Sequence, residues 1–497
     1  MTKTAKILLY CILYSLILWS LVPLLRHSLP MDTQEAIVWG KYCLWGTTKH
    51  PPFSGWVAYL FYWLSGRADG IMYFLSQLCI ALGLVYIYKL AYALLKNPQS
   101  ALVAALLQFG VIYYHFSAVE FNVNVISIAL WPMCAFYFWQ AYTKDSLKDW
   151  LLFGLLTGIN LLNKYVSGVL LVSLAVFVLA DKNALRLLKN PKVYAGAAVA
   201  MAVLAPHLYW LYQNDFESFY YISTRSSGGK MTSAWRHLVY PLKFIAAQIM
   251  FCAAGWLTYW VFYRQAKISS FSLKSVFVSK SGTEQRTSLF ILLTALLPIG
   301  IFSGISLING HALKSMWGFP FLFMFGILLV HYVPLNWTPV RLKKFVGTML
   351  VWSTLFAAGY AVQCLVTKSQ RFTSQCPQIA SALEQEWHQK MPDLPLKYVG
   401  GDVWYADMLN LYAPSAPKPM IWLNPKNNPW FNVADFEQSG ALVVCENIDE
   451  YKHYQHQYPH RLSQPRQMRL EFKNYFGKTK PKEVFYGFYL PEEVKYE

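Results

Sequence analysis

The chain has 497 residues, of which 56% are hydrophobic and only 14% are charged, and its mean hydropathy is +0.30. A soluble domain carries about 25% charged residues, so this chain lacks the charge needed to cover a water-exposed surface. A soluble enzyme of two or three domains is excluded. The formal net charge of +18 would suggest a nucleic-acid partner in a soluble protein, so the position of the charges decides what it means.

Nine apolar runs of roughly 18 or more residues are long enough to cross a bilayer. They cover 7–25, 71–95, 101–118, 125–142, 193–212, 239–263, 289–308, 312–333 and 345–367. The first run resembles a signal peptide, but it has full spanning length and no small-residue cleavage site follows it. We therefore predict an uncleaved transmembrane helix there.

The segment 151–180 is interrupted at Asn163-Lys164-Tyr165 and has basic residues on both flanks. Basic flanks at both ends predict that both ends face the cytoplasm. Two helices of about 12 to 16 residues, at roughly 1.5 Å per residue, can enter the bilayer and return if protein surrounds their turn. We predict a hairpin whose turn presents Lys164 at the far face.

Counting that hairpin as two passes gives about 11 crossings, with the N-terminus inside and the C-terminus outside. Many of the Lys and Arg residues then fall in cytoplasmic loops, which is the bias expected of membrane proteins. The net charge therefore no longer suggests nucleic-acid binding. Once the loop charges are assigned to membrane topology, no soluble face keeps a basic stripe with stacking aromatic residues.

After Thr367 the composition changes to about 130 residues with more charges and prolines. Short buried strands near 396–399 and 441–444 alternate with helical stretches at 376–390 and 403–412, which predicts a small α/β domain outside the cytoplasm. We expect a transmembrane domain over 1–367 and a periplasmic domain over 368–497. Cys376 and Cys445 could form a disulfide there, which the sequence leaves open because it does not give their separation.

The external loop 26–70 holds the first candidate catalytic residues. If the stretch after Pro30 is helical, Asp32 and Glu35 are three residues apart and share one face. Such a pair can supply a general base or bind a cation. The alternative is that Asp32 caps the helix and Glu35 only adds to its first turn.

Other polar residues fall on the same external side, and each has a structural alternative. His50 precedes two prolines and could be a solvated residue of a rigid turn. Lys164, Arg225 and Lys314 are cations on a face that membrane proteins usually deplete of them, where a phosphate is one ligand they could hold. Snorkelling of these side chains to the interface is the competing explanation.

The order of these residues resembles the polyprenyl-phosphate-sugar-dependent glycosyltransferases of the GT-C fold, in particular the bacterial enzymes of families 39 and 83. The most specific motifs are Asp32-Thr-Gln-Glu35-Ala and Lys49-His50-Pro51-Pro52. Supporting motifs are Phe121-Asn122-Val-Asn124, Leu162-Asn163-Lys164-Tyr165, Pro206-His207-Leu-Tyr-Trp210 and Trp317-Gly-Phe-Pro320. That group includes protein O-mannosyltransferases, the aminoarabinose transferase acting on lipid A and the galacturonosyltransferases acting on lipopolysaccharide core.

The resemblance implies a role for each candidate. Asp32 or Glu35 would be the catalytic base, with Asp32 favoured, although the usual family pattern has adjacent Asp and Glu. The residues implied to hold the donor phosphate are His50, Lys164, Arg225 and Lys314. Further substrate-binding candidates are Lys49, Asn122, Asn124, Tyr165, His311 and Trp317.

The reaction implied is transfer of a sugar, with inversion, from undecaprenyl phosphate to lipid A or lipopolysaccharide core at the periplasmic face of the inner membrane. Neither a cofactor nor a divalent metal is expected, since only two carboxylates are evident. The expected partners are a lipid-linked sugar donor, a glycolipid acceptor and membrane lipids. A protein O-glycosyltransferase is the alternative within the enzyme class, and a transporter or flippase of lipid-linked sugars is the alternative outside it.

Overall fold

The computed structural model describes residues 2–491 except 228–230, 267–281, 426–427 and 429. The chain forms two compact units. The first, called here the helical unit, contains Met1–Val22, Lys49–Phe53 and Tyr73–Gly359. The second, the sheet unit, contains Pro23–Thr48, Ser54–Met72 and Tyr360–Glu497. The first external loop is thus divided between the two units.

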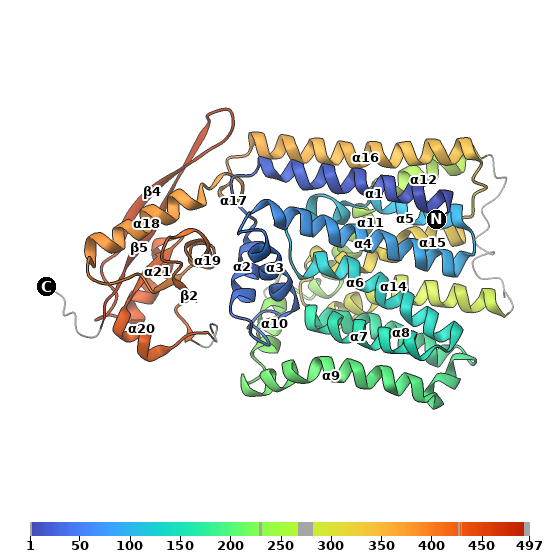
Figure 1. Cartoon of the computed structure of the whole chain (residues 1–497), viewed down its shortest axis with the longest axis horizontal. Coiled ribbons are helices and arrows are strands. Elements are labelled where there is room, and N and C mark those ends of the chain that lie inside the picture. Colours follow the sequence, from blue (N-terminus) through green and yellow to red (C-terminus); the bar gives the residue numbers. More distant parts are fainter. Residues whose placement is uncertain (1, 228–230, 267–281, 426–427, 429, 492–497) are drawn as a thin grey trace. The chain divides into compact units, whose positions relative to one another are not determined.

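The helical unit is built from α-helices with short 3₁₀ segments between them (Figure 1). Its α-helices are α1 (Lys3–Leu21), α4 (Gly70–Leu95), α5 (Pro98–Leu106), α6 (Val123–Lys144), α7 (Leu147–Asn163), α8 (Gly168–Ala180), α9 (Pro191–Gln213), α10 (Glu217–Ser227), α11 (Arg236–Phe251), α12 (Ala253–Gln265), α14 (Thr283–Asn309), α15 (Phe325–Tyr332) and most of α16 (Pro339–Val366). Its 3₁₀ segments are η2 (Leu107–Gly110), η3 (Ile112–Tyr114), η4 (Phe116–Val119), η5 (Tyr165–Ser167), η6 (Ala184–Lys189) and η7 (Ser315–Met324), whereas most of η1 (Val22–Leu25) belongs to the sheet unit.

Among the described residues, seven helices are long and apolar enough to cross a membrane, and the number rises to nine if each of two bent pairs is one span. The bent pairs are Pro98–Gly110 with Ile112–Val119, at 85°, and Arg236–Phe251 with Ala253–Gln265, at 57°. All nine coincide with the apolar runs of the sequence. The prediction of a multi-pass helical membrane protein is confirmed.

The predicted hairpin is present as α7 and as the short apolar helix Tyr165–Ala180. Its first arm packs closely on α9, because a Cβ atom on Gly154 would lie only 2.0 Å from the carbonyl oxygen of Gly196. Small residues let helix backbones approach in this way. Inside a bilayer the hydrophobic effect does not drive helices together, so such close packing favours their association. The structure thus supports seven to nine spans among the described residues, and the count of about eleven crossings stays a prediction.

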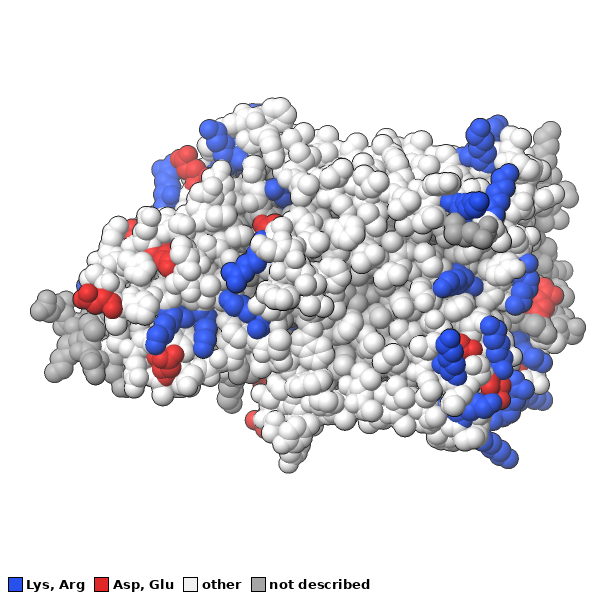
Figure 2. Space-filling view, in the orientation of Figure 1, with Lys and Arg blue, Asp and Glu red and all other residues white. Residues whose placement is uncertain are grey.

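Helices far apart in the chain also pair in the helical unit. The first helix, α1, runs beside α16 (Figure 1), where Trp19 Nε1 donates to Ser353 Oγ at 3.2 Å and the Tyr14 and Thr354 hydroxyls lie 2.6 Å apart. Figure 2 shows that Lys and Arg gather at the end of this unit where the N-terminus lies, whereas the middle of its helices carries almost no charge. That distribution is typical of a membrane-embedded bundle.

The sheet unit combines two short helices of the first loop with a C-terminal α/β domain. The loop helices are α2 (Met31–Lys41) and α3 (Phe53–Leu64), and the domain helices are α17 (Gln370–Thr373), α18 (Cys376–Lys390), α19 (Val403–Tyr412), α20 (Val433–Ser439) and α21 (Ile448–Gln457). The strands are β1 (Tyr398–Gly401), β2 (Lys418–Ile421), β3 (Ala441–Cys445), β4 (Arg466–Lys473) and β5 (Thr479–Tyr489), in the order β2-β1-β3-β5-β4. The first three strands are parallel and β5 is antiparallel to both β3 and β4.

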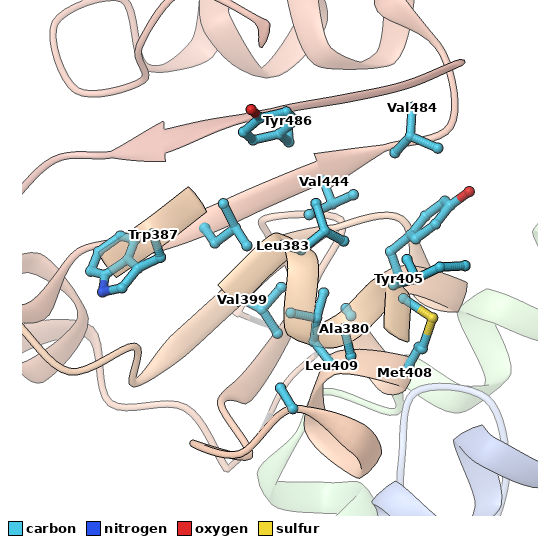
Figure 3. Close-up of a cluster of buried hydrophobic side chains, with 14 of the residues drawn as sticks. Ala380, Leu383, Trp387, Val399, Tyr405, Met408, Leu409, Val444, Val484 and Tyr486 are labelled. Carbon is cyan, nitrogen blue, oxygen red and sulfur yellow. The ribbon is translucent and has the colours of Figure 1, made fainter. Parts of the chain in front are cut away.

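Each face of this sheet carries its own apolar core, because successive strand residues point to opposite faces. Figure 3 shows the core beneath α18 and α19, where Leu383, Tyr405 and Val444 are buried together. The other core is formed with α20 and α21 and includes Phe436 and Tyr451. The predicted small α/β domain is confirmed, and its helices α18 and α19 have the bounds expected from the sequence.

The disulfide considered from the sequence is not formed. Both Cys376 and Cys445 are free thiols. Cys376 belongs to the core on the α18 face and Cys445 to the core on the opposite face, so the sheet lies between the two sulfur atoms. The alternation of strand side chains separates them, which no spacing along the chain could reveal.

Candidate functional site

The helical unit brings His50, Lys49 and Lys164 together. The segment Lys49–Phe53 packs within this unit, and the charges of Lys164 and Lys49 both act on the His50 imidazole. Lys164 lies at the break between α7 and α8 and is 8% exposed. His50, Lys49 and Lys164 therefore lie close to one another at the hairpin turn.

Burial lowers the pKa of His50 to about 3, and repulsion by Lys164 and then by Lys49 acts in the same direction. The imidazole is therefore neutral at pH 7, with one nitrogen as a donor and the other as an acceptor. The positive charge of this cluster comes from the lysines. A phosphate oxygen could accept hydrogen bonds from both kinds of group.

We expect His50 to destabilise the protein in acid. In the unfolded chain His50 takes up a proton near its ordinary pKa of about 6.5, whereas in the folded chain it stays neutral until about pH 3. As the pH is lowered through this window, the free energy of unfolding therefore falls by at most about 1.4 kcal/mol per pH unit. A His50→Gln variant should lose less thermal stability than the wild type between pH 7 and pH 4.5. Equal losses in the two proteins would contradict this assignment.

Two neighbouring asparagines fix Lys164 through α6. Lys164 Nζ donates to Asn124 Oδ1 at 2.5 Å, and Asn124 is 2% exposed. Asn122 is the N-cap of α6, since its side chain accepts from the backbone N–H groups of Asn124 and Val125. Asn163 Nδ2 donates to the Val123 carbonyl at 2.8 Å, which ties the end of α7 to the same turn. These bonds give Asn122 a positioning role and Asn124 a direct contact with the Lys164 ammonium group.

Tyr165 links the hairpin turn to α9 and α10. Its hydroxyl lies 2.9 Å from His207 Nε2, and its ring stacks on Phe219 with centroids 4.9 Å apart. His207 is 1% exposed. The contact with Phe219 positions the helix that carries Arg225, whose own side chain lies outside the described part of the structure.

The candidates His311 and Lys314 lie between α14 and η7, and Trp317 lies in the first turn of η7. Gly310 ends α14 in the left-handed region, with φ at 64°, and the His311 carbonyl accepts from Ser306 Oγ at 2.6 Å. Gln248 Nε2 donates to the Ser315 carbonyl at 3.1 Å, and the Trp317 ring packs edge-on to Phe302. The segment is therefore anchored to α11 and α14, separately from the bonds that hold Lys164.

The two carboxylates of the first loop lie on α2 in the sheet unit. The N-cap of α2 is Pro30 and makes no side-chain bond, so Asp32 does not cap this helix. Asp32 stands in the first turn, where the helix dipole favours a negative charge. It is partly exposed, whereas Glu35 is 4% exposed. Of the two, Asp32 is the carboxylate that solvent can reach.

Helix α2 is held by α19 of the C-terminal domain. Lys41 Nζ donates to Asn410 Oδ1 at 3.3 Å, and Asn410 Nδ2 donates to the Tyr42 hydroxyl at 3.3 Å. The Tyr42 ring stacks on Trp430 with centroids 4.8 Å apart. The C-terminal domain therefore positions the carboxylate helix, a link that sequence reasoning did not find because 369 residues separate Lys41 from Asn410.

Helix α2 also crosses α3 at a pair of glycines. A Cβ atom on Gly40 would lie 1.9 Å from the Gly55 carbonyl oxygen and 2.5 Å from Tyr59 Cβ. Backbone cannot move aside as a flexible side chain can, so any larger residue forces the two helices apart.

We expect Gly40→Ala to destabilise the sheet unit by about 1–3 kcal/mol, the usual cost of overpacking. Thermal unfolding of the purified protein checks the stability. Gly347→Ala on α16, where an added Cβ atom meets nothing within 4 Å and φ is not positive, is the control for glycine loss without a clash. An unchanged melting temperature in Gly40→Ala would contradict the close crossing.

The fold and the arrangement of the spans are those of the GT-C glycosyltransferases, and the resemblance seen in the sequence is confirmed. The structure matches that of ArnT from Cupriavidus metallidurans bound to undecaprenyl phosphate over 100% of both chains, with a TM-score of 0.62 at 13% identity. Residues 49–210 match the family model described as dolichyl-phosphate-mannose-protein mannosyltransferase. That range contains His50, Asn124 and Lys164.

Two lipopolysaccharide core galacturonosyltransferases of Rhizobium johnstonii are similar in sequence. RgtA is 26% identical over 253 residues, which cover 50% of each chain. RgtB is 23% identical over 192 residues, which cover 38% of this chain and 39% of RgtB. The match thus spans half or less of the length of these curated relatives.

Sequence reasoning missed His207 as a neighbour of the site, although its Pro206-His207 motif was visible. A histidine on an apolar helix is more often a satisfied core residue than a ligand, and only the bond to Tyr165 places it here. Among the described residues, no group of three or more His, Cys, Asp or Glu side chains is arranged to hold a metal ion.

Proposed function

We propose that the protein is an inverting glycosyltransferase that moves a sugar from undecaprenyl phosphate to lipid A or lipopolysaccharide core. The observation that carries the proposal is the cluster of His50, Lys164 and Asn124, which offers a buried cation and neutral hydrogen-bonding groups suited to a phosphate. The sequence similarity to two lipopolysaccharide galacturonosyltransferases supports a lipopolysaccharide acceptor.

In the proposed reaction an acceptor hydroxyl oxygen attacks the anomeric carbon of the donor sugar. The bond from that carbon to the phosphate oxygen breaks, and its electron pair stays on the phosphate. Lys164 stabilises the charge that develops there, and His50 donates a hydrogen bond without adding charge of its own. The acceptor's proton goes to a carboxylate of α2, for which Asp32 is the better candidate because it is the more exposed.

The proposed location is the bacterial inner membrane, with the N-terminus in the cytoplasm and the residues 368–497 in the periplasm. The gathering of Lys and Arg at the N-terminal end of the helical unit supports this orientation (Figure 2). Periplasmic placement also suits the donor, since a lipid-linked sugar needs no nucleotide in that compartment. Labelling of Cys43, which is exposed, by a membrane-impermeant thiol reagent in intact spheroplasts tests the orientation.

The proposed reaction uses no divalent metal and no cofactor. Charge on the leaving phosphate is offset by Lys164 and by the other proposed cations, Arg225 and Lys314, so a metal has no required task. We expect transfer by the purified protein to be unchanged by EDTA at about 5 mM, which is in large excess over trace divalent ions. Loss of activity that added Mg²⁺ or Mn²⁺ restores would contradict this part of the proposal.

Mass spectrometry of lipid A and core from cells with and without the gene tests the function. The expected result is one sugar mass present only when the gene is present, and absent again with an Asp32→Asn, Glu35→Gln double variant. Incorporation of a labelled sugar from synthetic undecaprenyl-phosphate sugar by purified protein then distinguishes an enzyme from a transporter, which moves the donor without forming a glycosidic bond.

Transfer to protein is the second candidate. It is favoured by the description of the matching family model, which names a protein mannosyltransferase. In that case the sugar mass appears on envelope proteins, and lipopolysaccharide from the two strains is identical.

A further inference from the structure

The turn that joins β4 to β5 carries an exposed aromatic pair. Tyr475 is 47% exposed and Phe476 is 67% exposed. A single exposed apolar residue is common on protein surfaces and by itself indicates no partner. This turn differs from such cases in its fixed shape, its hydrogen bonds to the ends of two membrane spans and its positive charge.

Asn474 gives the turn its shape. Its side-chain oxygen accepts from the backbone N–H groups of Phe476 and Lys478, at 3.1 and 3.0 Å, and Gly477 adopts the left-handed conformation with φ at 73°. Asn474 itself is 5% exposed. Asn side chains that bond to the backbone just ahead of them fix turns, so a defined backbone presents the Phe476 ring to its surroundings.

The turn is bonded to the last residues of two membrane spans. Asn474 Nδ2 donates to the Val366 carbonyl at 2.9 Å, and the Tyr475 hydroxyl donates to the Leu25 carbonyl at 3.0 Å. Val366 is the last residue of α16 and of its candidate span, and Leu25 is the last residue of the candidate span that begins with α1. All four residues belong to the sheet unit.

The length of the first span places the turn at the membrane surface. The span that ends at Leu25 has 23 residues, or about 35 Å of helix. The hydrocarbon core of a bilayer is about 30 Å thick and is bordered on both sides by headgroups. A span centred in the core therefore ends among the headgroups, and the Tyr475 hydroxyl lies at the same level. Aromatic side chains are enriched there, because that level is apolar on one side and wet on the other.

The surroundings of the turn are positively charged. Five exposed cations lie on the turn, beside it on the strands or just after the end of α16: Lys368, Arg371, Lys473, Lys478 and Lys480. Residues 366–373 and 472–480 contain no Asp or Glu. Arg371 belongs to α17, which packs on β4. In the proposed orientation this is the non-cytoplasmic surface, which membrane proteins usually deplete of Lys and Arg, so the cluster indicates an anionic partner.

We infer that the β4–β5 turn docks on an anionic phospholipid surface, with the Phe476 ring among the headgroups and the lysine ammonium groups beside the lipid phosphates. The ring contributes apolar area to the interface, and the lysine stems cover apolar surface while their charged ends stay at phosphate level. Each lysine near an anionic surface favours this contact about fivefold. Docking gives the sheet unit an attachment to the membrane besides its covalent links to the spans, whichever sugar the protein transfers.

The test measures the depth of a spin label beside the turn in the full chain. Thr479→Cys, an exposed position, carries a nitroxide on a Cys43→Ser background, because Cys43 is the exposed native thiol. Nanodiscs contain phosphatidylcholine alone or equal parts of phosphatidylcholine and phosphatidylglycerol. Electron paramagnetic resonance compares collisions of the label with oxygen, which concentrates in lipid, and with a water-soluble nickel chelate. Val433→Cys, an exposed apolar position on α20, is the control label site.

We expect a higher ratio of oxygen to nickel collisions at 479 than at 433, and a further rise at 479 when phosphatidylglycerol is present. Replacing Lys473, Lys478 and Lys480 together by Gln should weaken docking about fivefold per lysine and remove the effect of phosphatidylglycerol. Phe476→Ala should lower the ratio at 479 in both lipids. The matched control removes three other exposed lysines of the same domain, by Gln substitution of Lys390, Lys418 and Lys452.

Three results overturn the docking surface. The first is an equal collision ratio at 479 and 433 in both lipids, and the second is equal behaviour of the two triple Gln variants. The third is a label at 479 that is shielded from both oxygen and the nickel chelate, which indicates a protein contact in place of lipid. A response to added lipid A but not to phosphatidylglycerol also contradicts the inference. None of these measurements uses sugar transfer, so the docking surface and the proposed function can fail independently.

Discussion

Replacing Asp32 by Asn is expected to lower the rate of sugar transfer by about a thousandfold, within the 10²–10⁴-fold range of general-base catalysis. Asn keeps the shape and polarity of the side chain but cannot accept the acceptor's proton. Asp32 is partly exposed in the first turn of α2, where solvent can reach its carboxylate. We expect the KM for the donor to change little, because the loss falls on the chemical step.

Glu35→Gln should behave differently, since Glu35 is buried along the same helix. We expect a smaller loss of rate together with lower thermal stability, because a buried side chain loses bonds that it makes in the fold. Initial rates with synthetic donor, measured beside melting temperatures, distinguish the two variants. Glu483→Gln, an exposed carboxylate on β5, is the matched control and should retain wild-type activity. Full activity in an Asp32, Glu35 double variant would refute the catalytic assignment.

Replacing Lys164 by Met is expected to reduce transfer by about 10²–10³-fold, the effect of removing one preorganised group that stabilises developing charge. Met has similar length and no charge, so packing at the hairpin turn is largely kept. The loss should appear both in kcat and in affinity for undecaprenyl phosphate, since Lys164 is proposed to hold the phosphate before and during the reaction.

Asn124→Ala tests the same contact from the other side. The 2.5 Å bond from Lys164 to Asn124 positions the cation, so this variant should lose less than Lys164→Met, and the double variant should lose little more than Lys164→Met alone. Lys182→Met, an exposed lysine between α8 and η6, is the matched control for loss of charge. If losses from the Lys164 and Asn124 variants simply add, the two residues do not act as a unit.

The helical part of the fold was largely predictable, because it depends on local composition. Each apolar run of spanning length became a span or a bent pair, since a backbone in lipid must satisfy its hydrogen bonds within its own segment. The break at Asn163-Lys164 was likewise visible as polar residues inside an apolar stretch. The C-terminal helices α18 and α19 followed from the same local reading.

The candidate site was predictable only as a set of residue types. The sequence motifs contain His50, Asn124 and Lys164, but the chemistry of these side chains depends on the groups that they contact in the folded protein. The neutral state of His50 follows from burial and from lysine charges, one of them 114 residues away along the chain. The role of Asn122 as a helix cap, and the approach of His207 to Tyr165, came from the packed structure.

The sequence by itself determined that this is a multi-pass membrane protein with a terminal α/β domain, a carboxylate-bearing first loop and the motifs of a lipid-linked sugar transferase. Those features depend on hydropathy and residue spacing within short stretches of the chain, so they can be predicted locally. The tertiary structure decided the separation of Cys376 from Cys445, the support of α2 by Asn410 and the contact of Lys164 with Asn124. Each of these depends on which side chains the packing of distant segments turns toward one another.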